Sequence, residues 1–532
     1  MTHALLYDTT LRDGMQGENI FFTPEDKVKL AKRIDDAGIH YIEGGWPGSN
    51  PGARRFFELA KDIDFTHAKL AAFGSTRHPS KKAEDDPNLN ALIDSGAPVI
   101  TIFGKSWDLH VKEVMDNTLE NNLAMIQESI AFLLSCGREV IYDAEHFFDG
   151  FKENPEYALQ TLEAAYNGGA RTLVLCDTNG GSLPSEVEDI LTRVTRHFES
   201  AKEEIIYGIH AHNDCAMAVA NSVCAVQNGA RMVQGTVNGY GERCGNADLT
   251  ALIPIMALKL DVDCISSPNL KKIKNLSRFV SETANMTPLN GRPFVGKSAF
   301  AHKGGIHVSA VNKIPRAYEH IDPERVGNQR RVLVSEQAGK SNIEYKAREL
   351  GVDLKGNEQN GQNIVATVKE LEEDGFEFDI AEGSLKLVME KLTDQFRPHF
   401  ELMSFRVTIE KDQERPCYCH AMIKVKVGRK IEITSAEGDG PVSALDNALR
   451  KALSNIFPEL DNMHLVDFKV RVIDGREGTA AKVRVLIESR DENNIFTTIG
   501  VSEDIIEASW QALADSFQYK LAMDSEKQKE TT

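Results

Sequence analysis

The sequence predicts a (β/α)8 TIM barrel, followed by a helical accessory subdomain and a C-terminal α+β domain made of two βββα repeats. Three observations indicate this order. Over roughly the first 246 residues, short apolar runs alternate with helical patterns eight times. From about residue 263 to 397, mostly helical patterns replace the alternation. After about residue 398, strands with alternating apolar and polar residues appear, and the same order of elements occurs twice.

Each unit of the predicted barrel pairs a short apolar run with a helical pattern. The predicted strands are Ala4–Tyr7, Tyr41–Gly44, Lys69–Phe73, Val99–Phe103, Glu139–Asp143, Thr172–Cys176, Ile205–Ile209 and Met232–Val237. The helical patterns between them include Pro24–Ala37, Ala53–Lys61, Thr118–Cys136, Pro155–Gly168 and Ser185–Ser200. A doubly wound open sheet is the alternative, and it is disfavoured because no Gly-x-Gly-x-x-Gly motif follows the first strand.

Length, charge and cysteine usage restrict the class of protein. At 532 residues the chain is longer than one ordinary domain of about 150 residues. The formal net charge of −19 argues against nucleic acid and anionic membranes as partners. No apolar run approaches the ~18 residues that a membrane-spanning helix needs. Eight scattered cysteines suit a reducing compartment, and a strand beginning at Ala4 leaves no room for a targeting peptide, so we expect a cytoplasmic protein.

The segment Gly208–Asp214 carries the first sign of chemistry, because it reads Gly-Ile-His-Ala-His-Asn-Asp directly after a predicted strand. Alternate side chains of a strand point the same way, so His210 and His212 share one face. Two imidazoles at a strand end are typical of half a metal site. A pair of hydrogen-bonded histidines is the alternative interpretation.

Polar and reactive residues also follow other strands of the predicted barrel. These segments are Asp8–Gln16, Glu43–Gly48, Asp143–His146, Asp177–Gly180 and Asn238–Asn246. In a barrel of parallel strands the carboxyl ends meet at one face, which is where TIM barrels carry their active sites. The sequence therefore predicts one active site rather than a set of unrelated strand ends.

Three motifs, in this order on such a barrel, carry a resemblance to a known family. They are Leu11-Arg12-Asp13-Gly14-x-Gln16, His210-Ala-His212-Asn-Asp214 and Gly241-Glu242-Arg243-x-Gly245-Asn246. The chain resembles the acyl-CoA-condensing enzymes related to 2-isopropylmalate, homocitrate and citramalate synthases, which share a metal-dependent barrel with the hydroxymethylglutaryl-CoA lyases. The resemblance implies Asp13, His210, His212 and Asn246 as metal ligands. Such a mixed nitrogen and oxygen set suits Mn²⁺, Mg²⁺ or Zn²⁺.

The resemblance also implies a reaction in which acetyl-CoA condenses with a 2-keto acid and the thioester is then hydrolysed. Arg12, next to Asp13, would offset the charge of the developing alkoxide. Thr178 would donate to the substrate carboxylate, as its family counterpart does, and Gln16 and Glu43 complete the polar substrate-binding set.

Removing a proton from the acetyl methyl group requires a base within hydrogen-bond reach. The family segment that carries a catalytic histidine matches Ala301–Val308, and His307 is the residue that corresponds to it, with His302 as the alternative. Glu145 would orient or charge this histidine. Tyr318, in a stretch that resembles the one reaching into the partner's active site, would assist from the neighbouring subunit.

Two segments bear on the keto acid: Glu-Gly-Gly-Trp-Pro-Gly-Ser-Asn-Pro at 43–51 and Asp-Ala-Glu-His-Phe-Phe-Asp-Gly at 143–150. They most resemble the long citramalate synthases of the family. If Trp46, Phe73 or Phe103 fills the pocket, only a small side chain such as the methyl of pyruvate fits. The expected reaction then gives (R)-citramalate and CoA, early in isoleucine biosynthesis.

Three alternatives to this function stay open. A 2-isopropylmalate or homocitrate synthase would share the metal site but accept a larger keto acid. A lyase is disfavoured because Cys244 lies within Glu-Arg-Cys-Gly-Asn rather than in a Gly-Gly-Cys-Pro loop. A catalytically dead amino-acid sensor is disfavoured because the four ligand positions are intact.

The C-terminal part is an internal repeat. Strands at 405–409, 421–427 and 430–434 precede a helix at 441–456, and strands at 466–472, 482–488 and 496–499 precede a helix at 504–521. Ala444, Ala448 and Leu449 align with Ala508, Ala512 and Leu513 at an offset of roughly 64 residues. This part resembles the regulatory domain of 2-isopropylmalate and citramalate synthases, which implies a homodimer inhibited by an end-product amino acid, with isoleucine expected and leucine the alternative.

The predicted domains are a catalytic barrel at 1–262, helical accessory subdomains at 263–397, a regulatory dimerisation domain at 398–524 and a disordered tail at 525–532.

Overall fold

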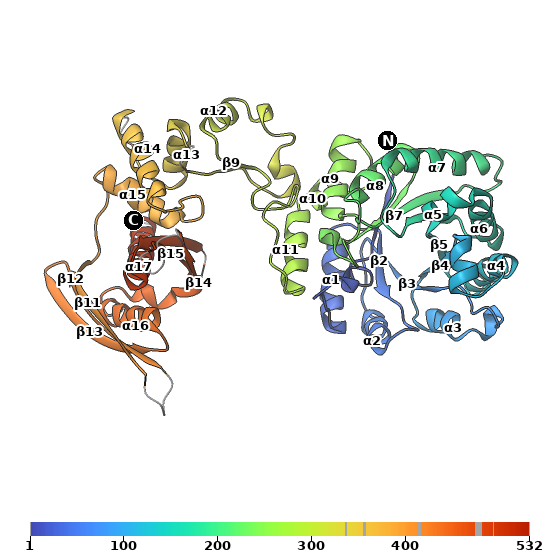
Figure 1. The fold of residues 1–532 in the computed structure, drawn as a ribbon, viewed down its shortest axis with the longest axis horizontal. Helices are drawn as coiled ribbons and strands as arrows, with labels where there is room; N and C mark the ends of the chain where they lie inside the picture. The colour runs from blue at the N-terminus through green and yellow to red at the C-terminus, as the bar shows by residue number, and fades with distance from the viewer. Residues whose placement is uncertain are drawn as a thin grey trace. The chain divides into compact units, whose positions relative to one another are not determined.

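The computed structural model of the protein describes residues 2–335, 338–354, 358–411, 417–473, 481–492 and 494–530. Its N-terminal part is a closed barrel of eight parallel strands that follow one another in chain order (Figure 1). The strands are β1 Leu5–Asp8, β2 Tyr41–Gly45, β3 Lys69–Ser75, β4 Val99–Lys105, β5 Glu139–Glu145, β6 Thr172–Asp177, β7 Ile206–Ala211 and β8 Met232–Gly235. The predicted TIM barrel is confirmed.

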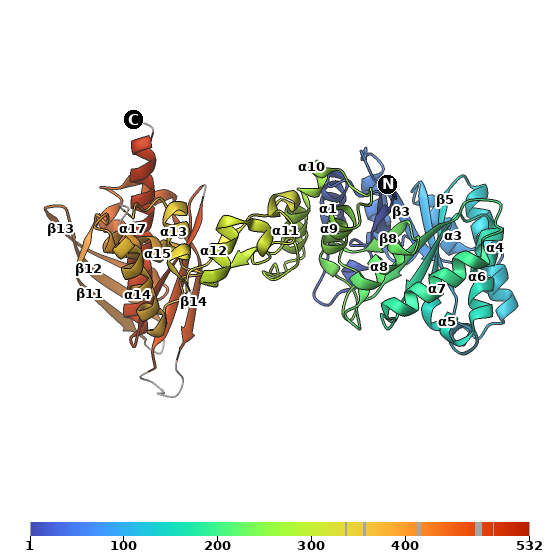
Figure 2. The ribbon, with the colours of Figure 1, turned by 90° about the horizontal axis from the view of Figure 1, so that it is seen from above.

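Helices cover the outside of this barrel (Figure 2). They are α1 Pro24–Asp36, α2 Pro51–Ala60, α3 Pro87–Asp94, α4 Leu119–Ser135, α5 Phe147–Glu153, α6 Pro155–Gly168, α7 Pro184–His197, α8 Ala218–Gln227, α9 Leu249–Lys259, α10 Ser267–Leu270 and α11 Ile273–Thr283. Helix α1 shows why they start where they do. The hydroxyl of Thr23 accepts from the N–H of Asp26, the carboxylate of Asp26 accepts from Thr23 in return, and Pro24 occupies the first helical position.

Short helical turns connect several of these elements: η1 Gly14–Gln16, η2 Ala83–Asp85, η4 Val237–Gly239, η6 Pro323–Val326 and the π-helical η3 His110–Val114. Of these, η1 follows β1 and η4 follows β8. These two strands pair with each other, Leu5 opposite Met232, and so close the barrel. Residues that lie far apart in the sequence thereby become neighbours at the carboxyl ends of the strands.

Strand alternation divides the barrel's apolar residues into two sets. One set fills the interior and includes Tyr7, Val99 and Val174. The other faces the surrounding helices and includes Ile42 and Ile100. Because both faces of each strand are buried, the strands read as continuous apolar runs in the sequence.

The chain forms two compact units, residues 1–300 with 321–329 and residues 301–320 with 330–532. This division differs from the boundary that the sequence predicts after residue 262. Helix α11 stays with the barrel because Ile273, Leu276 and Val280 are buried in the barrel's hydrophobic core. The later helices belong to the second unit.

The second unit begins with a small two-stranded sheet, β9 Ala301–His302 with β10 Arg331–Val332, and with helices. The helical elements are α12 Gly305–Lys313, η5 Pro315–Ala317, α13 Lys340–Glu349, α14 Glu358–Glu373 and α15 Glu382–Leu392. Residues of α13, α14 and α15 share a core that also includes Ile499 of the C-terminal repeats. The helical subdomain is therefore packed onto those repeats.

The two predicted βββα repeats are confirmed. The first repeat consists of β11 Glu401–Glu410, β12 Tyr418–Val427, β13 Lys430–Gly438 and α16 Pro441–Leu453. The second consists of β14 His464–Val472, β15 Val483–Arg490, β16 Ile495–Ser502 and α17 Ile505–Glu530. The turn η7 Pro458–Asn462 lies between the two repeats. Each trio is an antiparallel sheet. The helix residues that align between the repeats are all buried: Ala444, Ala448, Leu449, Ala508, Ala512 and Leu513.

Several strands of these sheets carry exposed apolar side chains instead. They are Leu402, Met403, Ile409, Ile431, Ile433, Val466, Phe468, Val470 and Val472, from β11, β13 and β14. We call this set the exposed apolar strand residues. A single protomer leaves these side chains open to solvent.

Helix α17 continues to Glu530, whereas the sequence analysis predicts a disordered tail from residue 525. The segment from Ser525 to Glu530 contains glutamate, lysine and glutamine and no glycine or proline, so it extends the helix at little cost. Thr531 and Thr532 lie outside the described residues. In the part of the chain that the structure describes, every helix is too short or too polar to cross a membrane.

Candidate active site and metal centre

The carboxyl ends of β1 and β7 bring three of the four expected metal ligands together. Asp13 follows β1, and His210 and His212 lie at the end of β7. The Nε2 atom of His210 is 3.2 Å from Oδ2 of Asp13, and that of His212 is 4.0 Å from the same oxygen. One ligand atom from each residue lies within 4.8 Å of the others, and all three side chains are buried.

Asn246 joins this group through the backbone, since it forms an isolated β-bridge with His212. Its amide nitrogen donates to the carbonyl of Tyr240 at 3.0 Å, so the amide oxygen is the free end. Within the described residues, Oδ1 of Asn246, Oδ1 of Asp13 and Nδ1 of His212 are buried without a hydrogen-bond partner. Leaving such an atom unpaired costs about 1–3 kcal/mol. A cation bound to the two oxygens would remove their part of that cost, so the residues present fit a divalent metal.

Electrostatics favours the ligand form of Asp13 and His212. For His210, burial lowers the pKa, but the hydrogen bond to Asp13 and the charge of that carboxylate outweigh it and raise the pKa. Burial alone would raise the pKa of Asp13, but the guanidinium of Arg12 and the imidazole of His210 outweigh it and hold this pKa well below its usual range. Burial lowers the pKa of His212 to about 4, and the neighbouring His210 acts in the same direction. An ionised carboxylate and a neutral imidazole are the forms that bind a metal ion.

A hydrogen-bonded pair behind His210 determines which of its nitrogens faces the site. Nε2 of Gln234, on β8, donates to Oδ1 of Asp143 at 2.9 Å. The oxygen of the same amide therefore faces Nδ1 of His210, also at 2.9 Å, and accepts a hydrogen bond from it. In the neutral imidazole, the form that binds a metal ion, the lone pair of His210 is then on Nε2, on the side of Asp13. Gln234 is missing from the sequence-based set, although a buried amide inside an apolar strand was a usable signal.

Arg12 is held on three sides. Its Nε donates to Oε2 of Glu43 at 2.5 Å, its Nη1 lies 3.5 Å from Oδ2 of Asp13, and its guanidinium carbon is 3.8 Å from the ring centre of Phe73. Glu43 is fully buried and also accepts from the hydroxyl of Tyr7 at 2.8 Å. Glu43, expected to bind substrate, thus contacts Arg12 and fixes its direction.

Three aromatic residues form a cluster beside Arg12. Trp46 meets Phe73 and Phe103 edge-to-face, with ring centres 6.0 and 5.7 Å apart. Phe73 and Phe103 stack on each other at 5.4 Å. The structure therefore groups the three aromatic side chains that the sequence analysis considers for the keto-acid pocket. We call this group the aromatic wall.

Three further predicted residues lie at neighbouring strand ends. Glu145, the last residue of β5, forms an ion pair with Lys105, its partner in register on β4. Thr178 follows β6, and its hydroxyl oxygen accepts from the N–H of His146 at 2.8 Å, so its O–H is left to donate. Gln16 lies exposed at the end of η1.

Arg243 links the loops around the site, a role that sequence reasoning missed. Its side chain donates to Oδ1 of Asp214 at 2.8 Å and to the carbonyl of Thr178 at 2.7 Å. It thereby joins the loops that follow β6, β7 and β8. The Gly-Glu-Arg motif indicated that this arginine is part of the site but not which loops it joins.

His307 and Tyr318 belong to the second unit, where the structure brings them together. Their ring centres are 4.4 Å apart, and both side chains are exposed. His302 is engaged differently, because its Nε2 lies 3.1 Å from the buried carboxylate of Glu319. That carboxylate also accepts two hydrogen bonds from Arg330.

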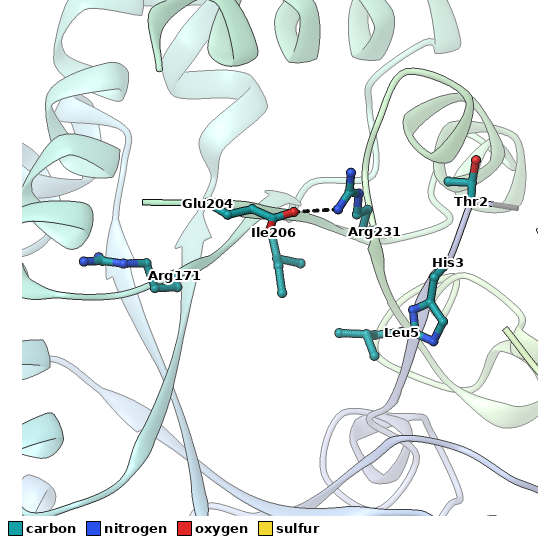
Figure 3. A pocket seen from close by; sticks show the side chains of 7 residues that line it. All are labelled: Thr2, His3, Leu5, Arg171, Glu204, Ile206 and Arg231. Atoms are coloured by element: carbon teal, nitrogen blue, oxygen red, sulfur yellow. Dashed lines mark hydrogen bonds and ion pairs between the residues drawn. The ribbon is translucent and has the colours of Figure 1, made fainter. Parts of the chain in front are cut away.

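A cavity of about 730 Å³ lies away from this site (Figure 3). It is lined by Thr2, His3, Leu5, Arg171, Glu204, Ile206 and Arg231. These residues lie at the amino ends of their strands, so the cavity opens at the opposite face of the barrel. Arg231 is paired with Glu204 at 2.7 Å, and Arg171 points away from them both (Figure 3). The cavity contains none of the predicted site residues.

Comparison with known families covers most of the chain. The HMGL-like family model matches residues 4–280, the homocitrate synthase post-HMGL domain-like model matches 294–375, and the LeuA allosteric (dimerisation) domain model matches 379–521. The first of these matches spans the barrel and the ligand residues, and the last spans the βββα repeats.

Curated relatives match over nearly the whole length. The chain is 51% identical over 523 residues to the (R)-citramalate synthase of Aquifex aeolicus, covering 98% of each protein. It is 50% identical over 528 residues to the (R)-citramalate synthase of Geobacter sulfurreducens, covering 99% of each. A probable 2-isopropylmalate synthase of Methanopyrus kandleri is 30% identical over 525 residues, which is 95% of this chain and 96% of that one. The matches of the barrel and of the C-terminal repeats to these families, together with the identity of about 50% over nearly the full length, show that the chain belongs to the HMGL-like family and, within it, to the (R)-citramalate synthases.

Proposed function

We propose that this enzyme condenses acetyl-CoA with pyruvate and hydrolyses the thioester, giving (R)-citramalate and CoA. It is an acyltransferase in which the acyl group becomes an alkyl group on transfer. The observation that carries the proposal is the identity of about half of all residues, over nearly full length, to (R)-citramalate synthases. The buried cluster of Asp13, His210 and His212 supports it chemically.

The residues at the barrel mouth would prepare the keto acid. A divalent metal held by Asp13, His210, His212 and Asn246 would supply a Lewis acid for the keto carbonyl. The guanidinium of Arg12 offsets the negative charge that develops on the oxygen of the keto group. Glu43 and Phe73 hold this guanidinium in place. The free O–H of Thr178 donates to the substrate carboxylate. Gln16 lies on the adjacent turn, exposed and able to contact substrate.

His307 is the proposed base for the methyl proton of acetyl-CoA. Its ring is exposed and packs against Tyr318, whereas His302 is engaged with Glu319, which supports His307 over His302. Glu145 is the residue proposed to orient or charge the base, and Tyr318 is proposed to act in the active site of the neighbouring subunit. These roles come from the family resemblance.

The aromatic wall supports pyruvate as the keto acid. Trp46, Phe73 and Phe103 fill the space beside Arg12, so a methyl group fits better than a branched or charged side chain. One extra methylene in a filled pocket changes binding by about 1–3 kcal/mol. The second candidate is a 2-isopropylmalate or homocitrate synthase acting on a larger keto acid, and the match to the Methanopyrus protein favours it to a lesser degree.

The C-terminal repeats would carry regulation. Their match to an allosteric and dimerisation domain supports a homodimer that responds to a small molecule. Isoleucine is the proposed inhibitor and leucine the alternative, because citramalate made from pyruvate leads towards isoleucine. A cytoplasmic location stays a prediction.

One assay tests the reaction and the substrate together. CoA release from acetyl-CoA is measured with pyruvate, 2-oxobutyrate, 2-oxoisovalerate and 2-oxoglutarate in turn, and the product with pyruvate is identified by chiral chromatography. We expect the highest kcat/KM with pyruvate. Preference for 2-oxoisovalerate or 2-oxoglutarate would favour the second candidate instead.

A further inference from the structure

The orientation of Trp46 in the aromatic wall is set by a residue outside the predicted site. The indole Nε1 of Trp46 donates to Oδ1 of Asn88 at 2.6 Å. The amide nitrogen of Asn88 donates in turn to the carbonyl of Ser75 at 2.8 Å. Because an indole N–H only donates and a carbonyl only accepts, the two partners fix which end of the Asn88 amide faces which.

Asn88 is itself held firmly at the start of α3. The carboxylate of Asp86 caps this helix and accepts from the N–H groups of Asn88 and Leu89, at 2.9 and 3.0 Å. The side chain of Leu89 is fully buried beneath the helix. The position of the Asn88 amide is therefore determined by both its backbone and its hydrogen bonds.

Two glycines leave room for this amide. A Cβ atom on Gly48 would lie 3.3 Å from Oδ1 of Asn88 and 3.4 Å from Nε1 of Trp46. A Cβ atom on Gly74 would lie 3.1 Å from the same oxygen and 2.9 Å from Leu92. The backbone around the Trp46–Asn88 hydrogen bond is thus shaped to fit it.

The angle of the indole determines the shape of the aromatic wall. Trp46 stands at 85° to Phe73 and at 83° to Phe103, so its edge meets both rings. Phe73 in turn lies beneath the guanidinium of Arg12, which contacts Asp13. Rotation of the indole would change the space next to Arg12, although the residues that contact Arg12 would stay the same.

We propose that Asn88 is a specificity-determining positioning residue. By holding Trp46 edge-on to the two phenylalanines, it keeps the wall closed against keto acids larger than pyruvate. This inference rests on the proposed function, in which the wall lines the keto-acid pocket.

The test is a double-mutant cycle read as substrate preference. The ratio of kcat/KM for 2-oxobutyrate to kcat/KM for pyruvate is measured for the full-length enzyme and for Asn88→Ala, Trp46→Phe and the double variant. We expect Asn88→Ala to raise the ratio about 3- to 10-fold. This change lies within the range by which one methylene group alters substrate preference. If Asn88 acts through the indole, Asn88→Ala has no further effect in the Trp46→Phe enzyme.

A matched control and a second variant accompany the cycle. Asn90→Ala, on the same helix, removes an amide that donates to the carbonyl of Glu84, and it should leave the ratio unchanged. Asn88→Ser keeps a polar side chain at the helix start but is too short to reach both partners, so it gives the same test if the alanine variant does not fold.

Fluorescence reports the orientation directly. The chain contains three tryptophans, and the emission lost in Trp46→Phe belongs to Trp46. In Asn88→Ala this emission should become more accessible to acrylamide, whereas in Asn90→Ala it should not.

The outcomes test the aromatic wall and the role of Asn88 separately. An unchanged ratio in Trp46→Phe would overturn the wall as the keto-acid pocket, and with it this inference. A changed ratio in Trp46→Phe, combined with an unchanged ratio in Asn88→Ala or with additive effects in the double variant, would overturn the inference about Asn88 alone.

Discussion

At the scale of single residues, the site depends on buried polar atoms that have no hydrogen-bond partner among the described residues. Oδ1 of Asp13 and Oδ1 of Asn246 are acceptors without donors in the described structure, and the two imidazoles face the same carboxylate. A group of this kind is stabilised when a cation satisfies it. Removal of one of these side chains should therefore lower metal content and catalytic rate together.

The first prediction concerns the ligands. Asp13→Ala, His210→Ala and His212→Ala should each abolish turnover and release bound metal, because each removes a ligand atom of the buried cluster. Metal content by elemental analysis and CoA release with pyruvate are the measurements. His197→Ala, which removes an exposed histidine paired with Glu163, is the control. Near-normal activity of metal-stripped enzyme would contradict the role of the metal.

The second prediction concerns Gln234. Gln234→Leu removes the acceptor for Nδ1 of His210, so the imidazole is free to rotate and to carry its proton on either nitrogen. Losing such an orienting partner typically costs about 10- to 100-fold in metal affinity. A competition titration of the metal-free protein with a chelating dye measures this loss. Gln227→Leu, at an exposed position at the end of α8, should bind metal like the unchanged enzyme.

At the scale of elements, β9 and α12 place two histidines in different surroundings. His302 on β9 contacts a buried carboxylate that is already paired with Arg330. His307, on the first turn of α12, has an exposed ring whose partner is Tyr318. A base must reach substrate, so the exposed position suits the catalytic role better.

The third prediction follows from this difference. His307→Ala should leave the binding of metal and keto acid intact and stop the exchange of the acetyl-CoA methyl protons with solvent. Incorporation of solvent deuterium, followed by mass spectrometry, is the measurement. Exchange at the unchanged rate would place the base elsewhere, and His302→Ala measured alongside would identify the alternative.

The element pattern was predictable from the sequence, but the ends of the elements were less so. Both faces of the barrel strands are buried, so a run such as the one from Val99 to Phe103 indicates a strand. In the structure β4 continues through Gly104 and Lys105, because hydrogen bonds to β5 extend past the last apolar residue. Polar strand ends carry the chemistry, and apolar runs do not mark them.

The candidate site was predictable as a set of residues and not as a set of contacts. The motifs indicated Asp13 and the two histidines. The role of Gln234 depends on the register in which it lies opposite His210 on β7, and that of Asn88 depends on how α3 packs beneath the aromatic wall. Both roles are consequences of tertiary pairing. The amide of Gln234 inside an apolar strand could be noticed in the sequence, but the residue that it contacts could not.

At the scale of the whole molecule, the C-terminal repeats cannot be removed cleanly at the predicted boundary. A cut near Arg397 would separate helices α13–α15 from Ile499, with which they share a buried core. The helical segment would then expose Phe378 and Leu385. Regulation is therefore better tested in the full-length enzyme than by truncation.

The fourth prediction is inhibition by an amino acid. With pyruvate below saturation, isoleucine should lower the rate of the full-length enzyme several-fold or more, since coupling between such sites is typically about 1–3 kcal/mol. Leucine and valine serve as comparisons, with CoA release as the measurement. No response to any of the three at millimolar concentration would contradict a regulatory role for the repeats.

The fifth prediction concerns assembly. Ile433 on β13 and Val470 on β14 are 62% and 41% exposed, and a dimer partner would cover exposed apolar strand residues such as these. Ile433→Glu and Val470→Glu should each shift the protein towards the monomer in sedimentation experiments, because each places a charge in that contact. Glu432→Lys, a neighbouring change of charge on the same strand, is the control. A protein that stays dimeric in both variants would place the dimer contact elsewhere.

The closure of the barrel between β1 and β8 has a consequence for how the enzyme is made. On the ribosome, the first strand and Asp13 emerge long before β7 and β8 exist to flank them, and synthesis proceeds from the N-terminus. No nascent chain that ends before Asn246 contains the full ligand set. Loading of the proposed metal would therefore be a late event that follows translation of the whole barrel, and a ribosome-bound chain stalled before β7 should take up no metal at this site.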